Sequence, residues 1–122
     1  MKLAPIEPPR DFRVGRERDI TLRHVADVAL AADEIVTFTT ESGTEYDVVR
    51  KSWGYYATPS LNSRLARFRL RPALTLNRST GHRFVMLVEI GKETDFLAYV
   101  ERENIAILGW LDDAAPEFPA RG

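Results

Sequence analysis

Residues 34–48 carry a β-hairpin pattern that admits a single strand register. Two segments rich in β-branched and aromatic residues flank Glu41-Ser42-Gly43, which has the length and the glycine of a three-residue hairpin loop. In that register Phe38 lies opposite Tyr46, and the apolar side chains share one face. A two-residue loop would instead place Phe38 opposite Asp47. The sequence therefore predicts two antiparallel strands joined by the longer loop.

The spacing of apolar residues predicts the other elements. Apolar and polar residues alternate with a period near two over residues 20–30 and 70–76, which indicates strands, with a helix as the competing interpretation for 20–30. We expect two further strands over residues 83–90 and 105–111. The segment 83–90 is apolar on both faces, which is typical of a central strand. A helical period predicts two helices, one over about Pro59–Phe68 and one over Lys92–Glu103 that buries Phe96, Leu97 and Val100.

Two local signals mark the start and end of the first expected helix. Thr58-Pro59 supplies a capping residue followed by proline at the first helical position, and Pro72 disfavours helix at Arg71. Leu61, Leu65 and Phe68 would then face the core. The β pattern ends before this helix, at residues 53–57.

The element order β-β-β-α-β-β-α-β predicts a single α+β domain. Its sheet of about six strands would be mostly antiparallel, because hairpins outnumber crossovers. The chain has 122 residues, 44% of them hydrophobic and 29% charged, as expected for one globular domain. We expect residues 1–19 to form a Pro-containing arm, residues 20–111 the domain, and residues 112–122 an acidic flexible tail.

Composition excludes several classes of protein. The chain has no cysteine and two histidines, so we expect no disulfide, no structural zinc site and no cofactor. No segment has the roughly 20 apolar residues that span a bilayer, and the charged, Pro-containing N-terminus does not resemble a secretory signal. We therefore expect a cytoplasmic protein with no membrane partner.

Charge is distributed unevenly along the chain. The net charge is −1, yet residues 48–88 contain no acidic residue and eight basic ones. This segment carries +8 and the rest of the chain −9. The basic residues of the segment are Arg50, Lys51, Arg64, Arg67, Arg69, Arg71, Arg78 and Arg83. Guanidinium groups bind phosphate or carboxylate through paired hydrogen bonds, so this segment favours an anionic partner.

The candidate ligand site lies within residues 50–64, where aromatic and basic residues concentrate before the first expected helix. Three kinds of side chain would contribute to ligand binding: cations that neutralise an anion, rings that stack on a sugar or base, and polar groups that form hydrogen bonds. They are Arg50, Lys51 and Arg64; Trp53, Tyr55 and Tyr56; and Ser60 and Asn62. The competing interpretation is that Trp53 and one tyrosine are core residues and that the cations are merely solvated.

No catalytic residues can be assigned, and the sequence leans against an enzyme. His24 precedes Asp27 by three residues, but side chains at this spacing on a strand point to opposite faces, so the pair is not expected to form a dyad. His24 instead has the position of a hydrogen-bonded core histidine. His82 is a better candidate acid or base, yet no carboxylate is near it in sequence.

Residues 47–65 and 84–89 resemble a family of small uncharacterised bacterial proteins. The likeness covers about Asp19–Asp113, and such proteins are encoded beside surface-polysaccharide biosynthesis genes. The resemblance implies a sugar, sugar phosphate or nucleotide sugar as ligand, and it implies no catalytic residues.

Three functions remain open from the sequence. The leading hypothesis is a non-catalytic binding or accessory module for an anionic small molecule, a sugar phosphate or nucleotide sugar. The first alternative is a single-stranded nucleic-acid-binding domain that uses the remaining arginines as a backbone track. The second is a homodimeric protein-interaction domain in which the basic segment of one copy meets the acidic part of another.

Overall fold

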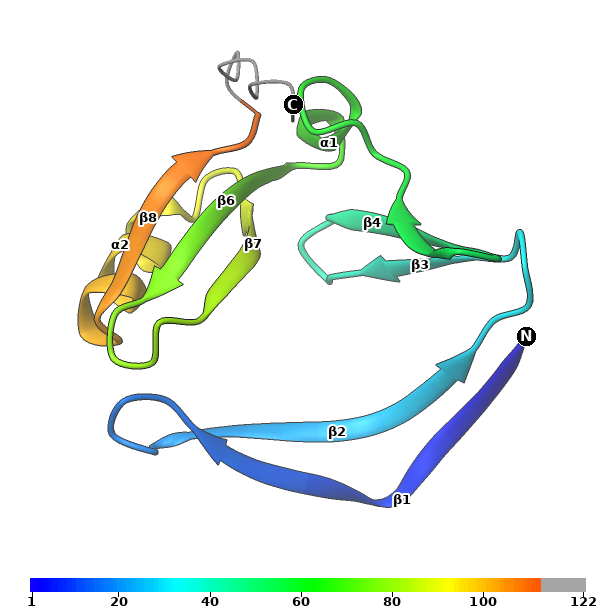
Figure 1. Ribbon diagram of the computed structural model, residues 1–122, viewed down its shortest axis with the longest axis horizontal. Coiled ribbons are helices and arrows are strands. Elements are labelled where there is room, and N and C mark those ends of the chain that lie inside the picture. Colours follow the sequence, from blue (N-terminus) through cyan, green and yellow to red (C-terminus); the bar gives the residue numbers. More distant parts are fainter. Residues whose placement is uncertain (113–122) are drawn as a thin grey trace, which may run out of the picture.

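The computed structural model describes residues 1–112 and has an α+β fold, which confirms the predicted class (Figure 1). Eight strands form three separate antiparallel sheets, whereas the sequence predicted a single sheet of about six strands. Apart from Asp112, the expected acidic tail lies outside the described residues. The elements are β1 (Lys2–Val14), β2 (Ile20–Ala29), β3 (Ile35–Thr39), β4 (Glu45–Lys51), β5 (Gly54–Ala57), α1 (Arg64–Arg67), β6 (Leu70–Asn77), β7 (Arg83–Glu89), α2 (Glu93–Arg102) and β8 (Ile105–Trp110).

The N-terminal segment forms strand β1, which pairs with β2 in a long two-stranded ribbon. No strand was predicted there, because Pro5, Pro8 and Pro9 break the alternation of residue types. The strand tolerates these prolines because the register is irregular between Pro5 and Arg10 and because β1 has only one hydrogen-bonded neighbour. Prolines on an edge strand also remove the N–H groups that would pair with another chain.

The second sheet has the order β3-β4-β5 and contains the predicted hairpin. Phe38 pairs with Tyr46, the Thr40 N–H donates to the Thr44 carbonyl, and Gly43 has a φ of +96°, so the three-residue loop is confirmed. The prediction that the β pattern ends before residue 53 is wrong. Residues 54–57 form β5, which folds back on β4 after a two-residue turn at Ser52-Trp53.

The third sheet has the order β7-β6-β8 and is covered on one face by α2. The central strand is β6, so the prediction that residues 83–90 lie centrally is wrong. Three residues of β6, Pro72, Ala73 and Thr75, are fully buried, as expected for a strand that has a neighbour on each side. On α2, Val100 is buried as expected, whereas Leu97 is exposed.

The first helix is much shorter than predicted, with α1 spanning four residues. Before it, the Ser60 side chain accepts a hydrogen bond from the Arg64 N–H at 2.9 Å, and the Ser60 carbonyl accepts one from Leu65 at 3.0 Å. These bonds hold residues 60–63 as a turn. Thr58 and Pro59 therefore do not begin a helix. Leu65 is fully buried, but Leu61 is exposed.

The three sheets are arranged around a common centre and contact one another at three corners (Figure 1). A glutamate makes a hydrogen bond at each corner. The Met1 amino group binds Glu34 at 2.9 Å, the Ser42 hydroxyl donates to Glu89 at 2.8 Å, and the Arg16 N–H donates to Glu103 at 2.7 Å.

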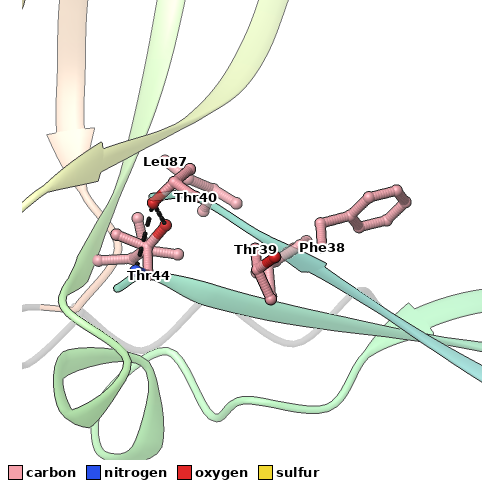
Figure 2. Close-up of a pocket in the computed structure, with 7 residues that line it drawn as sticks. Phe38, Thr39, Thr40, Thr44 and Leu87 are labelled. Atoms are coloured by element: carbon pink, nitrogen blue, oxygen red, sulfur yellow. Dashed lines mark hydrogen bonds between the residues drawn. The ribbon is translucent and has the colours of Figure 1, made fainter. Parts of the chain in front are cut away.

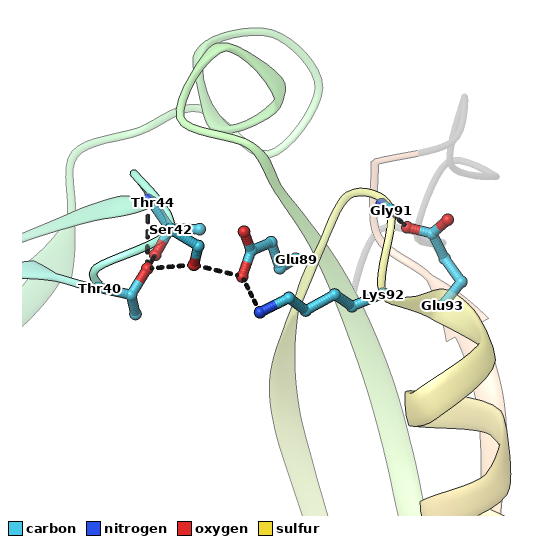
Figure 3. Close-up of polar contacts among 7 residues, drawn as sticks. All are labelled: Thr40, Ser42, Thr44, Glu89, Gly91, Lys92 and Glu93. Carbon is cyan, nitrogen blue, oxygen red and sulfur yellow. Dashed lines mark hydrogen bonds and ion pairs between the residues drawn. The ribbon is translucent and has the colours of Figure 1, made fainter.

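The corner between the second and third sheets joins the β3–β4 loop to the start of α2 through a chain of polar groups (Figure 3). The Thr40 hydroxyl contacts the Ser42 hydroxyl at 3.0 Å, and the Ser42 hydroxyl donates to Glu89. Lys92 pairs with the same Glu89 oxygen at 3.2 Å. The Ser42 hydroxyl, followed by Lys92, lowers the pKa of Glu89 and keeps it ionised.

Candidate functional site

The tip of the β4–β5 hairpin presents an aromatic platform formed by Trp53 and Tyr56. The two rings lie nearly parallel, with an interplanar angle of 18° and centroids 6.1 Å apart. Trp53 is 70% exposed and Tyr56 46% exposed, so neither is a core residue. Gly54 lies between them, and no atom lies within 4 Å of where its Cβ would be. The platform is therefore open to a flat ligand from solution.

Lys51 lies on the same face of the hairpin as Tyr56, because Val49 pairs with Tyr56 and side chains alternate along β4. Its amino group forms an ion pair with Asp33, in the turn before β3. The hydrogen bond to Asp33 raises the pKa of Lys51, so the amine stays protonated at neutral pH. The platform is thus bordered by a fixed cation and by a carboxylate that can accept hydrogen bonds.

Arg50 and Tyr55 occupy the opposite face of the same hairpin. They are cross-strand partners, and the Arg50 guanidinium lies 5.8 Å from the Tyr55 ring centroid. Arg50 also donates a hydrogen bond to the Lys51 carbonyl. Because Tyr55 and Tyr56 are consecutive on a strand, one ligand cannot stack on both rings from the same side.

The remaining predicted site residues lie in the turn before α1 and in α1 itself. The Ser60 hydroxyl accepts the Arg64 N–H, so its oxygen is engaged within the turn. Asn62 is exposed. The Arg64 guanidinium lies 5.6 Å from the Phe68 ring centroid. The structure thus brings Lys51, Trp53 and Tyr56 together, and it separates them from Arg50 with Tyr55 and from the turn.

Most of the acid-free segment's cations make no ion pair within residues 1–112. Lys51 pairs with Asp33, and Arg71 pairs with Asp112 at 2.9 Å while lying 4.1 Å from the Trp110 ring centroid. On the face of β6 that carries Arg71, the next two residues, Ala73 and Thr75, are uncharged and buried. The cations without an ion pair in the described part of the chain are Arg50, Arg64, Arg67, Arg69, Arg78 and Arg83.

Two cavities lie where the sheets approach one another, and neither is lined by a predicted site residue. The first, of about 250 Å³, lies between the second and third sheets (Figure 2). It is lined by Phe38, Thr39, Thr40, Thr44, Tyr46, Leu70 and Leu87. The alternation of residue types predicted that Phe38 and Tyr46 lie on one apolar face. It did not predict which strands lie opposite that face. Burial raises the pKa of Tyr46, so its phenol remains neutral.

The second cavity, of about 360 Å³, lies between the tip of the β1–β2 ribbon and the third sheet. Most of its wall is apolar. It is lined by Val14, Gly15, Leu22, Asn77, Phe84, Met86, Tyr99, Glu103 and Ile105. Glu103, which sequence reasoning missed, accepts hydrogen bonds from the Arg16 N–H and, at 3.0 Å, from Arg102. The Arg16 N–H, followed by Arg102, lowers the pKa of Glu103.

The expectation that His24 and Asp27 point apart is wrong. The His24 Nε2 lies 2.9 Å from the Asp27 carboxylate, and the Arg10 guanidinium lies 3.3 Å from Nδ1. The irregular register between Pro5 and Arg10 falls opposite this part of β2, where the strand alternation is disturbed. With Nε2–H donating to Asp27 and Nδ1 accepting from Arg10, both nitrogens are engaged. This arrangement stabilises the ribbon and leaves no nitrogen for a substrate.

Comparisons of the chain with family models, with curated proteins and with solved structures found no match. The resemblance stated from the sequence therefore stays a prediction. Among residues 1–112 no helix combines the length and the apolar character needed to cross a bilayer.

Proposed function

We propose that the protein is a non-catalytic binding module for an anionic sugar ligand, a sugar phosphate or nucleotide sugar, held at the β4–β5 hairpin. The Trp53–Tyr56 platform is the observation that carries this proposal. Two nearly parallel, exposed rings match the apolar face of a sugar or the face of a base. A soluble chain would normally bury rings of this size, so their exposure at a hairpin tip favours binding.

The polar groups at the border of the platform suit a sugar that carries phosphate. Lys51 supplies a fixed positive charge beside Tyr56, and Asp33 can accept hydrogen bonds from sugar hydroxyls. The arginines without a carboxylate partner lie outside the platform and add an attraction for anions over a longer range. The other predicted residues contribute to that field rather than to the platform itself.

Replacing Trp53 with alanine should weaken binding of the ligand. Stacking is worth about 1–3 kcal/mol per ring, which corresponds to a loss of affinity of about 5- to 150-fold. The chain has two tryptophans, so Trp110→Phe leaves Trp53 as the single tryptophan, and ligand binding should change its emission when it is excited selectively over tyrosine. Isothermal calorimetry with a panel of sugar phosphates and nucleotide sugars gives the affinities.

Tyr55→Ala is the matched control, because Tyr55 is exposed on the reverse face of the same hairpin. We expect it to change the affinity less than threefold. Equal losses from Trp53→Ala and Tyr55→Ala would contradict the platform. Equal binding of the neutral sugar and its phosphate would contradict the recognition of an anion.

Single-stranded nucleic acid is the second candidate ligand, favoured by the placement of the arginines without ion pairs. Arg64 and Arg67 lie on α1, whereas Arg78 and Arg83 lie at the other end of β6. Cations spread in this way suit an extended chain of phosphates better than one small molecule. Affinity for short RNA would then fall steeply with salt, with a slope of about −0.7 for each phosphate contacted, and a nucleotide sugar would give a shallow slope.

A further inference from the structure

The cavity of about 360 Å³ between the tip of the β1–β2 ribbon and the third sheet has a size and a composition that suit a small ligand. Binding pockets for small molecules have volumes of about 300–1,000 Å³ and apolar walls with a few polar groups. The polar residues that line this cavity are Asn77, Tyr99 and Glu103. Neither Trp53 nor Tyr56 lines it, so it lies apart from the ligand platform at the β4–β5 hairpin.

The apolar walls of this cavity approach each other without closing. Phe84 and Met86, which line the cavity, share a face of β7 with Val88, because side chains alternate along a strand. Val88 is 5% exposed, whereas Phe84, at the other end of this face, is 49% exposed. Leu22 of β2 lines the cavity from the ribbon and is 54% exposed. Solvent therefore reaches the space between the walls.

A hydrogen bond and a glycine hold the β1–β2 turn beside the third sheet. The Arg16 N–H donates to Glu103 at 2.7 Å, and the Glu103 Oε1 lies 2.8 Å from the position that a Cβ on Gly15 would occupy. The φ of Gly15 is +96°, so a side chain there would be strained as well as crowded. Specific contacts therefore set the separation of the two walls.

Glu103 places a carboxylate that is only 3% exposed in the wall of this cavity. Its Oε1 accepts a hydrogen bond from the Arg16 N–H, and its Oε2 accepts one from Arg102 at 3.0 Å. An ionised carboxylate has about four acceptor positions, so about two remain for a ligand. Because Arg102 already balances the negative charge, burial of a further charge would cost free energy without gaining a new partner. A neutral hydrogen-bond donor therefore fits this wall better than an ammonium or a carboxylate.

We propose that this cavity binds a small neutral molecule with an apolar body and one hydroxyl group, an alcohol or a phenol. The apolar body would displace water from Leu22, Phe84 and Met86, and the hydroxyl group would donate to Glu103. An apolar cavity of about 150 Å³ is sufficient for benzene, so this larger cavity has room for a ring with a substituent. The proposal is independent of the proposed function at the β4–β5 hairpin.

The test is a titration of the full chain with benzyl alcohol, toluene, benzylamine and benzoate, followed by NMR. The chain has two methionines, so labelled methionine methyl groups give one signal from Met86 in the cavity wall and one from Met1. We expect benzyl alcohol to shift the Met86 signal until saturation and to leave the Met1 signal unchanged. Toluene lacks the hydroxyl group, and a hydrogen bond to a charged group is strong enough that toluene should bind at least about tenfold more weakly.

The other compounds of the panel test the chemical class of the ligand. Tighter binding of benzylamine, a cation at neutral pH, or of benzoate, an anion, than of benzyl alcohol would overturn the neutral class. Toluene that binds as tightly as benzyl alcohol would overturn the role of Glu103. No shift of the Met86 signal with any of the four compounds, up to their solubility limits, would overturn the site itself.

Leu22→Trp tests the location by filling the cavity from the ribbon. Leu22 is 54% exposed, so the larger side chain requires no change in the core, which circular dichroism checks. The saturable shift of the Met86 signal should disappear. Leu97→Trp is the matched control, because Leu97 is 51% exposed on α2 and lines neither of the two cavities. It should bind benzyl alcohol like the unmodified protein, and unchanged binding by Leu22→Trp would contradict the proposed site.

Discussion

At the scale of single residues, Glu103 is a buried acidic side chain that connects two distant parts of the chain. It is 3% exposed, and its two oxygens accept hydrogen bonds from the Arg16 N–H and from Arg102. Both interactions favour the ionised form, which is why the pKa of Glu103 lies below its ordinary value of 4.5. The residue therefore ties the β1–β2 turn to the end of α2 through its charge.

Replacing Glu103 with glutamine should remove a pH-dependent part of the stability. The folded pKa is lower than the unfolded pKa, so the carboxylate stabilises the fold above the unfolded value, and this contribution is lost as the pH falls through the folded value. Urea unfolding should show the variant less stable at pH 7, with the difference shrinking below about pH 4.5. Glu101→Gln, an exposed change on the same helix, should show no such trend. A constant difference across pH would contradict the assigned role.

At the scale of elements, the β3–β4 hairpin followed its local sequence and the first helix did not. The β3–β4 register is fixed by the loop and by the apolar pattern next to it, both of which can be read locally. The segment before α1 has a capping residue and a proline. However, the Ser60 hydroxyl accepts a hydrogen bond from the Arg64 N–H, and the Ser60 carbonyl accepts one from the Leu65 N–H, so residues 60–63 form a turn. The helix-start signal at Thr58-Pro59 and the hydrogen bonds of Ser60 favour different conformations of this segment. The sequence alone does not show which conformation is more stable.

Gly43→Ala should destabilise the protein by strain in the β3–β4 loop. The φ of Gly43 is +96°, and no atom lies within 4 Å of an added Cβ, so the effect is conformational rather than steric crowding. The expected loss is about 1–2 kcal/mol in the free energy of unfolding. Gly109→Ala is the control, because its φ is not positive and its surroundings are equally open. Equal effects of the two variants would contradict the explanation.

At the scale of the whole molecule, three glutamates join the three sheets. Glu34, Glu89 and Glu103 accept hydrogen bonds from the Met1 amino group, the Ser42 hydroxyl and the Arg16 N–H, and the pKa of each is lowered. The largest cause is the Ala31 N–H for Glu34, the Ser42 hydroxyl for Glu89 and the Arg16 N–H for Glu103. Protonation of these groups weakens the corners before it affects the pairing inside a sheet.

Acidification should therefore loosen the sheets relative to one another while the strands persist. The amide proton of Arg16 reports the corner at Glu103, to which it donates at 2.7 Å, and the amide proton of Ala31 reports the state of Glu34, to which it donates at 2.7 Å within the turn before β3. Their hydrogen-exchange protection, measured by NMR relative to intrinsic rates, should fall as the pH drops below about 4.5. Protection within β6 should hold over the same range. Simultaneous loss at β6 would indicate global unfolding instead.

The sequence by itself determined the α+β class, the β3–β4 register, the last strand and the position of α2. Each depends on residues close together in the chain, where spacing and turn chemistry act directly. The sequence also singled out Trp53 and Tyr56 but placed them before a helix, because it did not reveal that residues 54–57 pair with β4.

Only the tertiary structure decided which strand is central, how the strands divide into three sheets, and which predicted site residues meet. Those outcomes depend on contacts between distant segments, such as Ser42 with Glu89 and Arg16 with Glu103. Strand pairing also assigns Tyr55 and Tyr56 to opposite faces. A periodic pattern states that a face is apolar, but what covers that face depends on contacts with distant parts of the chain.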